Sequence, residues 1–224
     1  MQNIAIEQSE PVGQDHLYPP PQEIKRLYEI AQHGASASLN SLRQFLGSDV
    51  DINLHCLSLL TLPVLIDRIR LFYQNHLGFH LRYSGEITGE IYTFFAGRDA
   101  KTLIDKMLGH KRFKYGKRFN RIEISVLTEL VNIVTNAFWR ALTDKTGMNW
   151  YLSPPTLIND LSRTLFYSSK IYTVDYFLVH FEYVIPVLDV RIQCIVLPTQ
   201  QTLARIFSKL TPDDLPELSC SRAI

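Results

Sequence analysis

Four polar residues recur at helical spacing in an otherwise apolar stretch of this chain, and they bring together a carboxylate and two carboxamides. Ser125, Glu129, Asn132 and Asn136 stand at i, i+4, i+7 and i+11. At about 100° per residue, this spacing confines them to an arc of roughly 60° on a helix. We name these four residues the polar seam. A rigid helix that exposes such groups is well suited to present a catalytic or recognition group.

The rest of the segment 121–142 predicts how the polar seam is positioned. Apolar residues cover most of the other directions around the helix axis, and a helix this apolar must be largely buried. The polar seam is then its one exposed strip. The residues expected to be covered are Ile122, Val126, Leu127, Leu130, Val131, Ile133, Val134, Ala137 and Phe138.

A second pattern lies downstream of the polar seam, where the pair Pro154–Pro155 follows Asn132 after 21 residues. The pattern Ser-x3-Glu-x2-Asn, then about 21 or 22 residues, then proline resembles the active-site signature of the CheC/CheX/FliY family of response-regulator phosphatases. The resemblance implies that Glu129 and Asn132 are the working pair. It also implies that Ser125 fills the first position, where the family has Asp or Ser, and that Pro154 closes a segment packed beside the pair.

An internal repeat supports this resemblance. The CheC family is built from two halves related by pseudo-two-fold symmetry, each a long helix, strands and a shorter helix. The stretches EIAQHGA and GEITGEIYTFFAGRDAKTLIDKMLG are similar to CheC sequence in their own right, and the resemblance covers roughly residues 22–210. An offset of about one hundred residues lays 29–42 over 129–142, Thr102–Leu103 over Thr202–Leu203, and 85–95 over 186–196.

The first half of the repeat departs from the signature. Gln32 replaces the asparagine and carries its carboxamide on a stem one methylene longer, which displaces the group by about 1 Å and can cost a catalytic group on the order of 100-fold. We therefore expect the first site to be degenerate and the second to be intact. For Glu29 and Gln32 the simpler interpretation is an ordinary solvated helix face. The residues at the four signature positions of the first half are Lys25, Glu29, Gln32 and Leu54.

The order of the elements predicts an α+β fold, with helices packed on a mainly antiparallel sheet. We expect a flexible, Pro-rich tail over 1–21, a single domain over 22–210 and a C-terminal tail over 211–224. Within the domain, a basic loop over 110–120 joins the halves 22–109 and 121–210. Helices are expected at 22–46, 98–109, 121–144 and 199–210, and strands at 50–60, 79–84, 86–95, 172–182 and 186–197.

Composition narrows the function classes. The formal net charge is +1, which gives no global reason to expect nucleic-acid binding. The three scattered cysteines, Cys56, Cys194 and Cys220, suggest neither a disulfide framework nor a zinc site. No apolar run approaches 18 residues, and the polar N-terminus is not a signal peptide, so we expect a cytoplasmic protein without a membrane partner.

The basic stretch HKRFKYGKRFNR (110–121) allows three interpretations. Basic residues interleaved with aromatic ones can form a nucleic-acid surface, although such a stretch is more often a solvated loop. The third interpretation is electrostatic steering of an acidic partner, with Lys111 and Arg112 among the partner-binding residues. The pair His76 and His80 has the spacing of metal ligands, but nearby Gly78 argues against a helix there, so no metal site is expected.

The resemblance also implies a reaction. A response regulator stores its signal as an aspartyl phosphate beside Mg²⁺ and a lysine, and hydrolysis needs a water held in line with the phosphorus. Asn132 would orient that water, and Glu129 would pair with the regulator's lysine. Ser125, Asn136 and Pro154 would contact the regulator.

The implied partner is a phosphorylated receiver domain, which supplies the Mg²⁺, so the chain needs no cofactor of its own. A CheD-like deamidase is a further possible partner. The alternative function is a non-catalytic scaffold that binds the regulator, as in the flagellar switch proteins related to CheC. The retention of both Glu129 and Asn132 favours the phosphatase, because a pure scaffold has no reason to keep the pair.

Overall fold

The computed structural model describes residues 21–47, 53–60, 76–109, 119–158 and 178–209, and all structural statements below concern these residues. The helices are α1 (Pro21–Leu46), α3 (Gly97–Leu108), α4 (Arg121–Thr146) and α6 (Gln200–Lys209). The strands are β1 (Asn53–Leu60), β2 (His76–Gly85), β3 (Gly89–Ala96), β4 (Trp150–Leu152), β5 (Thr156–Ile158), β6 (Leu178–Ile185) and β7 (Val190–Pro198). A short 3-10 helix, Pro186–Leu188, joins β6 to β7.

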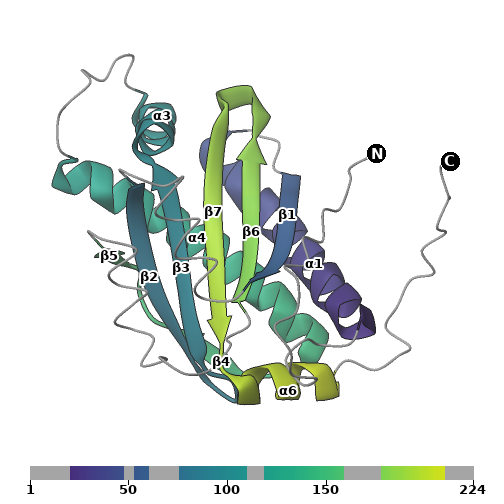
Figure 1. The fold of residues 1–224 in the computed structure, drawn as a ribbon. Helices are drawn as coiled ribbons and strands as arrows, with labels where there is room; N and C mark the ends of the chain where they lie inside the picture. Colours follow the sequence, from purple (N-terminus) through teal and green to yellow (C-terminus); the bar gives the residue numbers. More distant parts are fainter. Residues whose placement is uncertain (1–20, 48–52, 61–75, 110–118, 159–177, 210–224) are drawn as a thin grey trace, which may run out of the picture.

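The described strands form one antiparallel sheet with the order β1-β6-β7-β3-β2-β4, and β5 pairs with β2 beside β4. The two long helices, α1 and α4, cross one face of the sheet, while α3 and α6 lie at its two ends (Figure 1). This arrangement confirms the α+β class expected from the sequence.

The core lies between the sheet and the two long helices. Strand residues alternate between the two faces of a sheet, so Ile91 and Phe95 of β3 point into this core together with Leu81 and Tyr83 of β2. Helix α4 contributes a row at helical spacing, from Leu127 through Leu130, Val131 and Val134 to Phe138, all buried. Burial of this row fixes the rotation of α4 about its axis and therefore the direction in which its other face points.

Two sets of contacts reveal the pseudo-two-fold repeat. In the middle of the sheet, Thr93 of β3 pairs directly with Cys194 of β7, 101 positions further along. Between the helices, the ring of Phe138 covers Gly34, and the Ser38 hydroxyl donates to the main-chain oxygen of Val134 at 3.0 Å. Residues 34 and 134 are equivalent at an offset of 100, and so are residues 38 and 138, so the second contact is the first with the two helices exchanged. Helices α1 and α4 are therefore equivalent and antiparallel, and they are related by the same pseudo-two-fold axis as the strands.

The offset of about one hundred residues between the two halves, which aligned Thr102 with Thr202, is wrong for the short helices α3 and α6. Helix α3 follows Ala96 and buries Asp99, Ala100, Leu103 and Ile104, whereas α6 follows Thr199 and buries Thr202, Leu203 and Ile206. These patterns match at an offset of 103, which places Asp99, rather than Thr102, opposite Thr202. The turn before β7 is one residue longer than the turn before β3, and two further residues are added at the other end of the strand, because β7 is one residue longer than β3 and Thr199 separates β7 from α6.

The element boundaries follow the expected stop signals. Gly47 and Gly109 adopt φ values of 101° and 68°, in the left-handed region that favours glycine, and they end α1 and α3 as expected. Helix α4 runs past the expected end at 144 as far as Thr146, where Gly147 (φ 66°) caps it. The strands β4 and β5 were not expected, and Pro186–Leu188, expected to begin a strand, form the 3-10 helix, with Asp189 as its C-cap.

Some expectations concern residues outside the described ranges. They include the two tails, most of the basic loop (110–118) and the first part of the strand expected at 172–182. The domain boundaries accordingly stay predictions. In the described part of the chain, no helix is long and apolar enough to cross a membrane.

Candidate functional site

The N-terminus of α4 is fixed by a reciprocal cap just before the polar seam. The Glu123 main-chain N–H donates to the Asn120 side-chain oxygen at 3.0 Å, and the Asn120 main-chain N–H donates to the Glu123 carboxylate at 2.7 Å. This capping box satisfies two backbone donors that a helix start otherwise leaves unpaired. Glu123 is thereby buried and serves the helix itself, and the first turn of the polar seam starts from a rigid end.

The polar seam lies on the outer side of α4, as its spacing predicts. Ser125, Glu129 and Asn136 are exposed, and Asn132 is half-buried. Glu129 and Asn132 are one turn apart on the same strip, so an approaching molecule meets the carboxylate and the carboxamide together. The opposite side of the helix packs into the core, so these side chains are among the groups that α4 can offer to a partner.

Hydrogen bonds tie members of the polar seam to the helix and to one another. The Asn136 amide nitrogen donates to the main-chain oxygen of Asn132 and to its side-chain oxygen, both at 2.8 Å. The Ser125 hydroxyl donates to the main-chain oxygen of Arg121 at 2.8 Å. The carboxamide of Asn132 is therefore held by a neighbour one turn away rather than free to rotate.

An open groove adjoins Glu129, with a volume of about 380 Å³. Its apolar wall consists of Phe45, from the C-terminal end of α1, with Ile122 and Val126 of α4. Its polar wall comes from Arg121, Ser125 and Glu129.

The expectation that Ile122 is covered was wrong, because its side chain is 66% exposed. Sequence reasoning also missed Phe45. Only the crossing of two helices far apart in the sequence brings this residue to the polar seam.

The other flank of the polar seam faces β4 and β5. Trp139 lies about 20° from Asn132 around the helix axis and two turns further along. Its ring contacts Tyr83 of β2 and Trp150 of β4, with centroid distances of 4.7 Å and 5.4 Å. Asn132 therefore lies toward the β4–β5 side of α4, and Glu129 toward α1.

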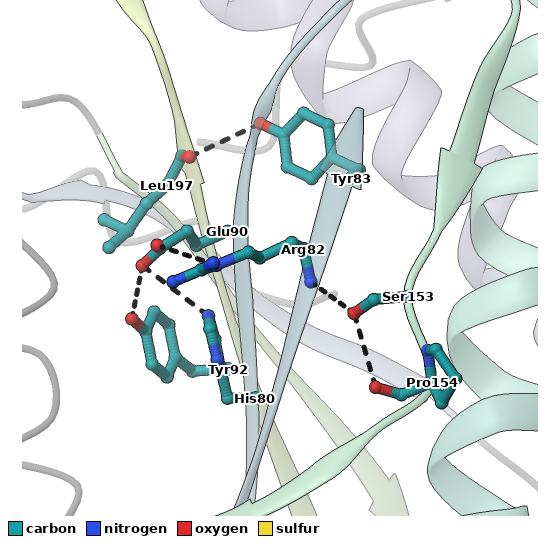
Figure 2. A network of polar contacts seen from close by, with 8 residues as sticks. All are labelled: His80, Arg82, Tyr83, Glu90, Tyr92, Ser153, Pro154 and Leu197. Carbon is teal, nitrogen blue, oxygen red and sulfur yellow. Dashed lines mark hydrogen bonds and ion pairs between the residues drawn. The ribbon is translucent and has the colours of Figure 1, made fainter. Parts of the chain in front are cut away.

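Pro154 lies in the connection between β4 and β5 and is exposed. Its neighbour Ser153 accepts a hydrogen bond from the Arg82 main-chain N–H at 2.9 Å, and this bond attaches the connection to β2 (Figure 2). Among the described residues, no hydrogen bond or ion pair joins Pro154 to Glu129 or Asn132. The structure thus places Pro154 on the flank nearer Asn132 without linking it directly to the pair.

The first half presents a different set of groups at the equivalent positions. The Lys25 ammonium lies 4.0 Å from the Glu29 carboxylate, an ion pair within α1, and Gln32 is exposed. Position 36, equivalent to Asn136, is an exposed serine. Leu54 pairs with Tyr183 in the sheet, where the second half has Pro154 in a connection between strands.

Other candidate residues are also placed by the structure or lie outside it. His76 and His80 stand on strand β2, not on a helix, and their rings pack against Phe94 and Tyr92. Within the described ranges, no three His, Cys, Asp or Glu side chains group in a way that could hold a metal ion. Lys111 and Arg112 lie outside the described residues.

Comparison with known proteins gives one relative by sequence. The chain is similar to the CheY-P phosphatase CheC of Bacillus subtilis (strain 168), with 26% identity over 138 residues. The match covers 60% of this chain, and it spans 65%, just under two thirds, of the length of that relative. No family model matches the chain.

Solved structures share the fold over a larger part of the chain. Thermotoga maritima FliY matches with a TM-score of 0.69 and 15% identity, over 85% of this chain and 96% of that structure. The FliM middle domain from H. pylori matches with a TM-score of 0.61 and 14% identity, over 86% and 100%.

The complex of CheX with CheY, BeF3 and Mg²⁺ from Borrelia burgdorferi matches with a TM-score of 0.51 and 15% identity. That match covers 75% of this chain and 97% of the matched chain. At these identities the solved structures establish the fold, and the CheC match adds the relationship in sequence. The chain is thus similar in sequence to CheC and has the fold seen in FliY, in the FliM middle domain and in the CheX–CheY complex.

Proposed function

We propose that this protein accelerates hydrolysis of the aspartyl phosphate on a CheY-like response regulator. The observation that carries the proposal is the pair of exposed Glu129 and half-buried Asn132, one turn apart on a helix whose opposite face packs into the core. The similarity to the CheY-P phosphatase CheC supports the same reaction class. The polar seam, the groove beside it and the β4–β5 connection then form one docking face.

Asn132 acts by orientation in this proposal, because a carboxamide is not basic enough to take a proton at neutral pH. Its oxygen accepts one hydrogen bond from Asn136 and keeps a second lone pair. That lone pair can accept a hydrogen bond from a water and hold it in line with the phosphorus. The water oxygen bonds to phosphorus as the bond to the aspartate oxygen breaks, and the products are the free carboxylate and inorganic phosphate.

Glu129 sets the docking position. Its exposed carboxylate pairs with the active-site lysine of the regulator in a charge-assisted contact. The neighbouring groove gives this contact an apolar companion, because Ile122 and Phe45 are exposed beside it and lose that exposure when a partner covers them. Fixing the regulator on these groups brings Asn132 to its phosphoryl group with little freedom left to lose.

The regulator contributes the remaining parts. In this proposal the Mg²⁺ belongs to the receiver domain, and the similarity to a chain of the CheX–CheY–BeF3–Mg²⁺ complex supports this assignment. A cytoplasmic location and a CheD-like accessory partner stay predictions of the sequence analysis.

The alternative is a scaffold that binds the regulator without dephosphorylating it. The fold is compatible with either function, because the FliM middle domain and the CheX–CheY complex both share it. Both functions require docking, and they differ only in the fate of the phosphoryl group. Glu129 and Asn132 favour catalysis.

A decay assay separates the two functions. A CheY-like regulator is phosphorylated with a small-molecule donor, the donor is removed, and loss of the phosphoryl group is followed with and without this protein. A phosphatase raises the decay rate in proportion to its concentration and turns over many regulators. A scaffold binds the regulator and leaves the decay rate unchanged, and that result would reject the proposal.

A further inference from the structure

We propose that Asn136 is a positioning residue, which holds the Asn132 carboxamide in the orientation that hydrolysis requires. This inference rests on the proposed function and deepens it. Sequence reasoning assigns Asn136 to partner binding, because it lies on the exposed strip. The geometry points to a different role, in which Asn136 acts on the reaction through Asn132.

The side-chain amide of Asn136 donates hydrogen bonds to two oxygen atoms of Asn132. The Asn136 nitrogen lies 2.8 Å from the Asn132 main-chain oxygen and 2.8 Å from its side-chain oxygen. An amide nitrogen carries two protons, so it can donate to both oxygens at once. The main-chain contact anchors the Asn136 side chain to the helix, and the second proton then fixes the Asn132 side chain relative to that anchor.

Fixing the side-chain oxygen also decides what Asn132 shows to a partner. An unheld asparagine can interchange its oxygen and nitrogen by rotating the terminal amide, a broad torsion with little intrinsic preference. With its oxygen turned toward Asn136, the Asn132 amide nitrogen and the second lone pair of the oxygen remain available. The held group can therefore accept from the attacking water and donate to a phosphoryl oxygen without first reorganising.

The repeat provides an internal comparison. In the first half, the residue four positions after Gln32 is Ser36, which has a hydroxyl in place of the amide. Among the described residues, no hydrogen bond joins Ser36 to the Gln32 carboxamide. The positioning contact thus occurs only in the half that also keeps the Ser-x3-Glu-x2-Asn spacing, as a role tied to that site requires.

The test compares Asn136→Ala and Asn136→Gln with wild type in steady-state dephosphorylation of a CheY-like regulator. Alanine removes both donors, and we expect kcat to fall about tenfold with KM within about twofold, because docking groups are untouched. Glutamine keeps an amide donor on a stem one methylene longer, so it should recover part of the rate that alanine loses. Asp144→Ala, an exposed truncation two turns further along α4, is the matched control and should behave as wild type.

A double-mutant cycle distinguishes positioning from direct contact with the partner. In an Asn132→Ala background, Asn136→Ala should cause no further loss, because its only route to the reaction is already gone. A rise in KM at constant kcat, or a further loss in that background, would overturn the proposal. An unchanged kcat in Asn136→Ala would do the same.

A structural readout keeps this test independent of the proposed function. If wild type does not accelerate decay at all, the proposed function fails, and the side-chain amide signals of Asn132 still report on the contact by NMR. We expect an ordered Asn132 amide in wild type and a mobile one in Asn136→Ala, with the backbone of α4 unchanged. An equally ordered amide in both proteins would show that Asn136 does not position it.

Discussion

The hydroxyl of Ser38 lies 3.0 Å from the main-chain oxygen of Val134 and 2.9 Å from that of Gly34, and it is fully buried where α1 crosses α4. One proton is thus shared between its own helix and the neighbouring one. So close an approach of two helices requires a small residue nearby, and Gly34 provides it beneath the Phe138 ring. This crossing sets the position of α4, and with it the direction of the polar seam.

Gly34→Ala should destabilise the fold by about 1 to 2 kcal/mol. A methyl group at this position would overlap the Phe138 ring, and overpacking of this kind costs about 1–3 kcal/mol. The better helix propensity of alanine returns at most about 1 kcal/mol. Urea unfolding followed by circular dichroism measures the difference.

The control for this prediction is a second background. In a Phe138→Leu protein the ring is gone, so Gly34→Ala should become neutral or stabilising. If the alanine were equally harmful in both backgrounds, the ring contact would not be the cause.

Asn132→Ala should strongly reduce phosphatase activity while leaving the fold intact. Loss of the group that orients the water should cost about 10- to 100-fold in rate, or roughly 1.4 to 2.7 kcal/mol of barrier. Truncation of a half-buried amide on the outer side of α4 should change stability by only a few tenths of a kcal/mol. Asn132→Asp should be nearly as poor, since an anion would face the phosphoryl group. A wild-type rate in the alanine variant would show that the site is assigned to the wrong residue.

Glu29→Ala combined with Gln32→Ala should leave the rate within about twofold of wild type. Lys25 already pairs with the Glu29 carboxylate, and the longer Gln32 side chain displaces its amide by about 1 Å from the place an asparagine would reach. The same decay assay applies. A loss as large as that of Asn132→Ala would mean that both halves of the repeat carry working sites.

Replacing the basic residues Lys111, Arg112, Lys114, Lys117 and Arg118 together by glutamine tests steering. If they attract an acidic regulator, kcat/KM should fall while kcat at saturating regulator stays close to wild type. Added salt should slow wild type and affect the variant much less, because screening acts on the charges removed. Identical salt profiles for the two proteins would exclude steering, and a lower kcat would point to a catalytic role instead.

Glu90→Gln should lower stability at neutral pH, by on the order of 1 kcal/mol, with a smaller effect in acid. Burial by itself raises the pKa of Glu90, but contacts with His80 and Tyr92 and the charge of Arg82 outweigh it, so this pKa lies below its ordinary value (Figure 2). A carboxyl with a lowered pKa stabilises the folded state above its unfolded pKa and loses that contribution as the pH falls through the folded one.

Urea unfolding of wild type and Glu90→Gln at pH 7 and in steps below pH 5 measures this effect. The difference between the two proteins should shrink toward the acid end. A difference that stays constant with pH would assign the stabilisation to shape rather than to charge.

The sequence predicted the features that depend on neighbouring residues, namely the ends of α1 and α3 and the exposed face of α4. Gly47 and Gly109 end helices because glycine alone adopts their backbone angles without strain. The polar seam is exposed because the apolar residues around it fix the rotation of α4. Both results depend on residues within a few turns of one another.

Sequence reasoning failed where distant segments decide the outcome. Ile122 belongs to the apolar part of the pattern, yet it is exposed, because no described element covers α4 beside the C-terminal end of α1. The three-residue strands β4 and β5 are too short to show alternation and exist by pairing with β2. The Asn136–Asn132 contact could have been found from sequence, since two asparagines at i, i+4 on an exposed strip can bond to one another.

Because α1 and α4 are antiparallel, the contacts that hold the two helices together lie away from the two candidate sites. Glu29 and Glu129 lie toward opposite ends of the helix pair, on the order of 20 Å apart at 1.5 Å per residue. Their surroundings at the surface can change without disturbing the centre, where Gly34 and Ser38 hold the two helices together. In a duplicated fold of this kind, one site can lose its functional residues one at a time while the other half keeps its structure. The contacts at the helix crossing therefore preserve the repeat, and the surface residues near the two ends of the helix pair determine which half carries a site.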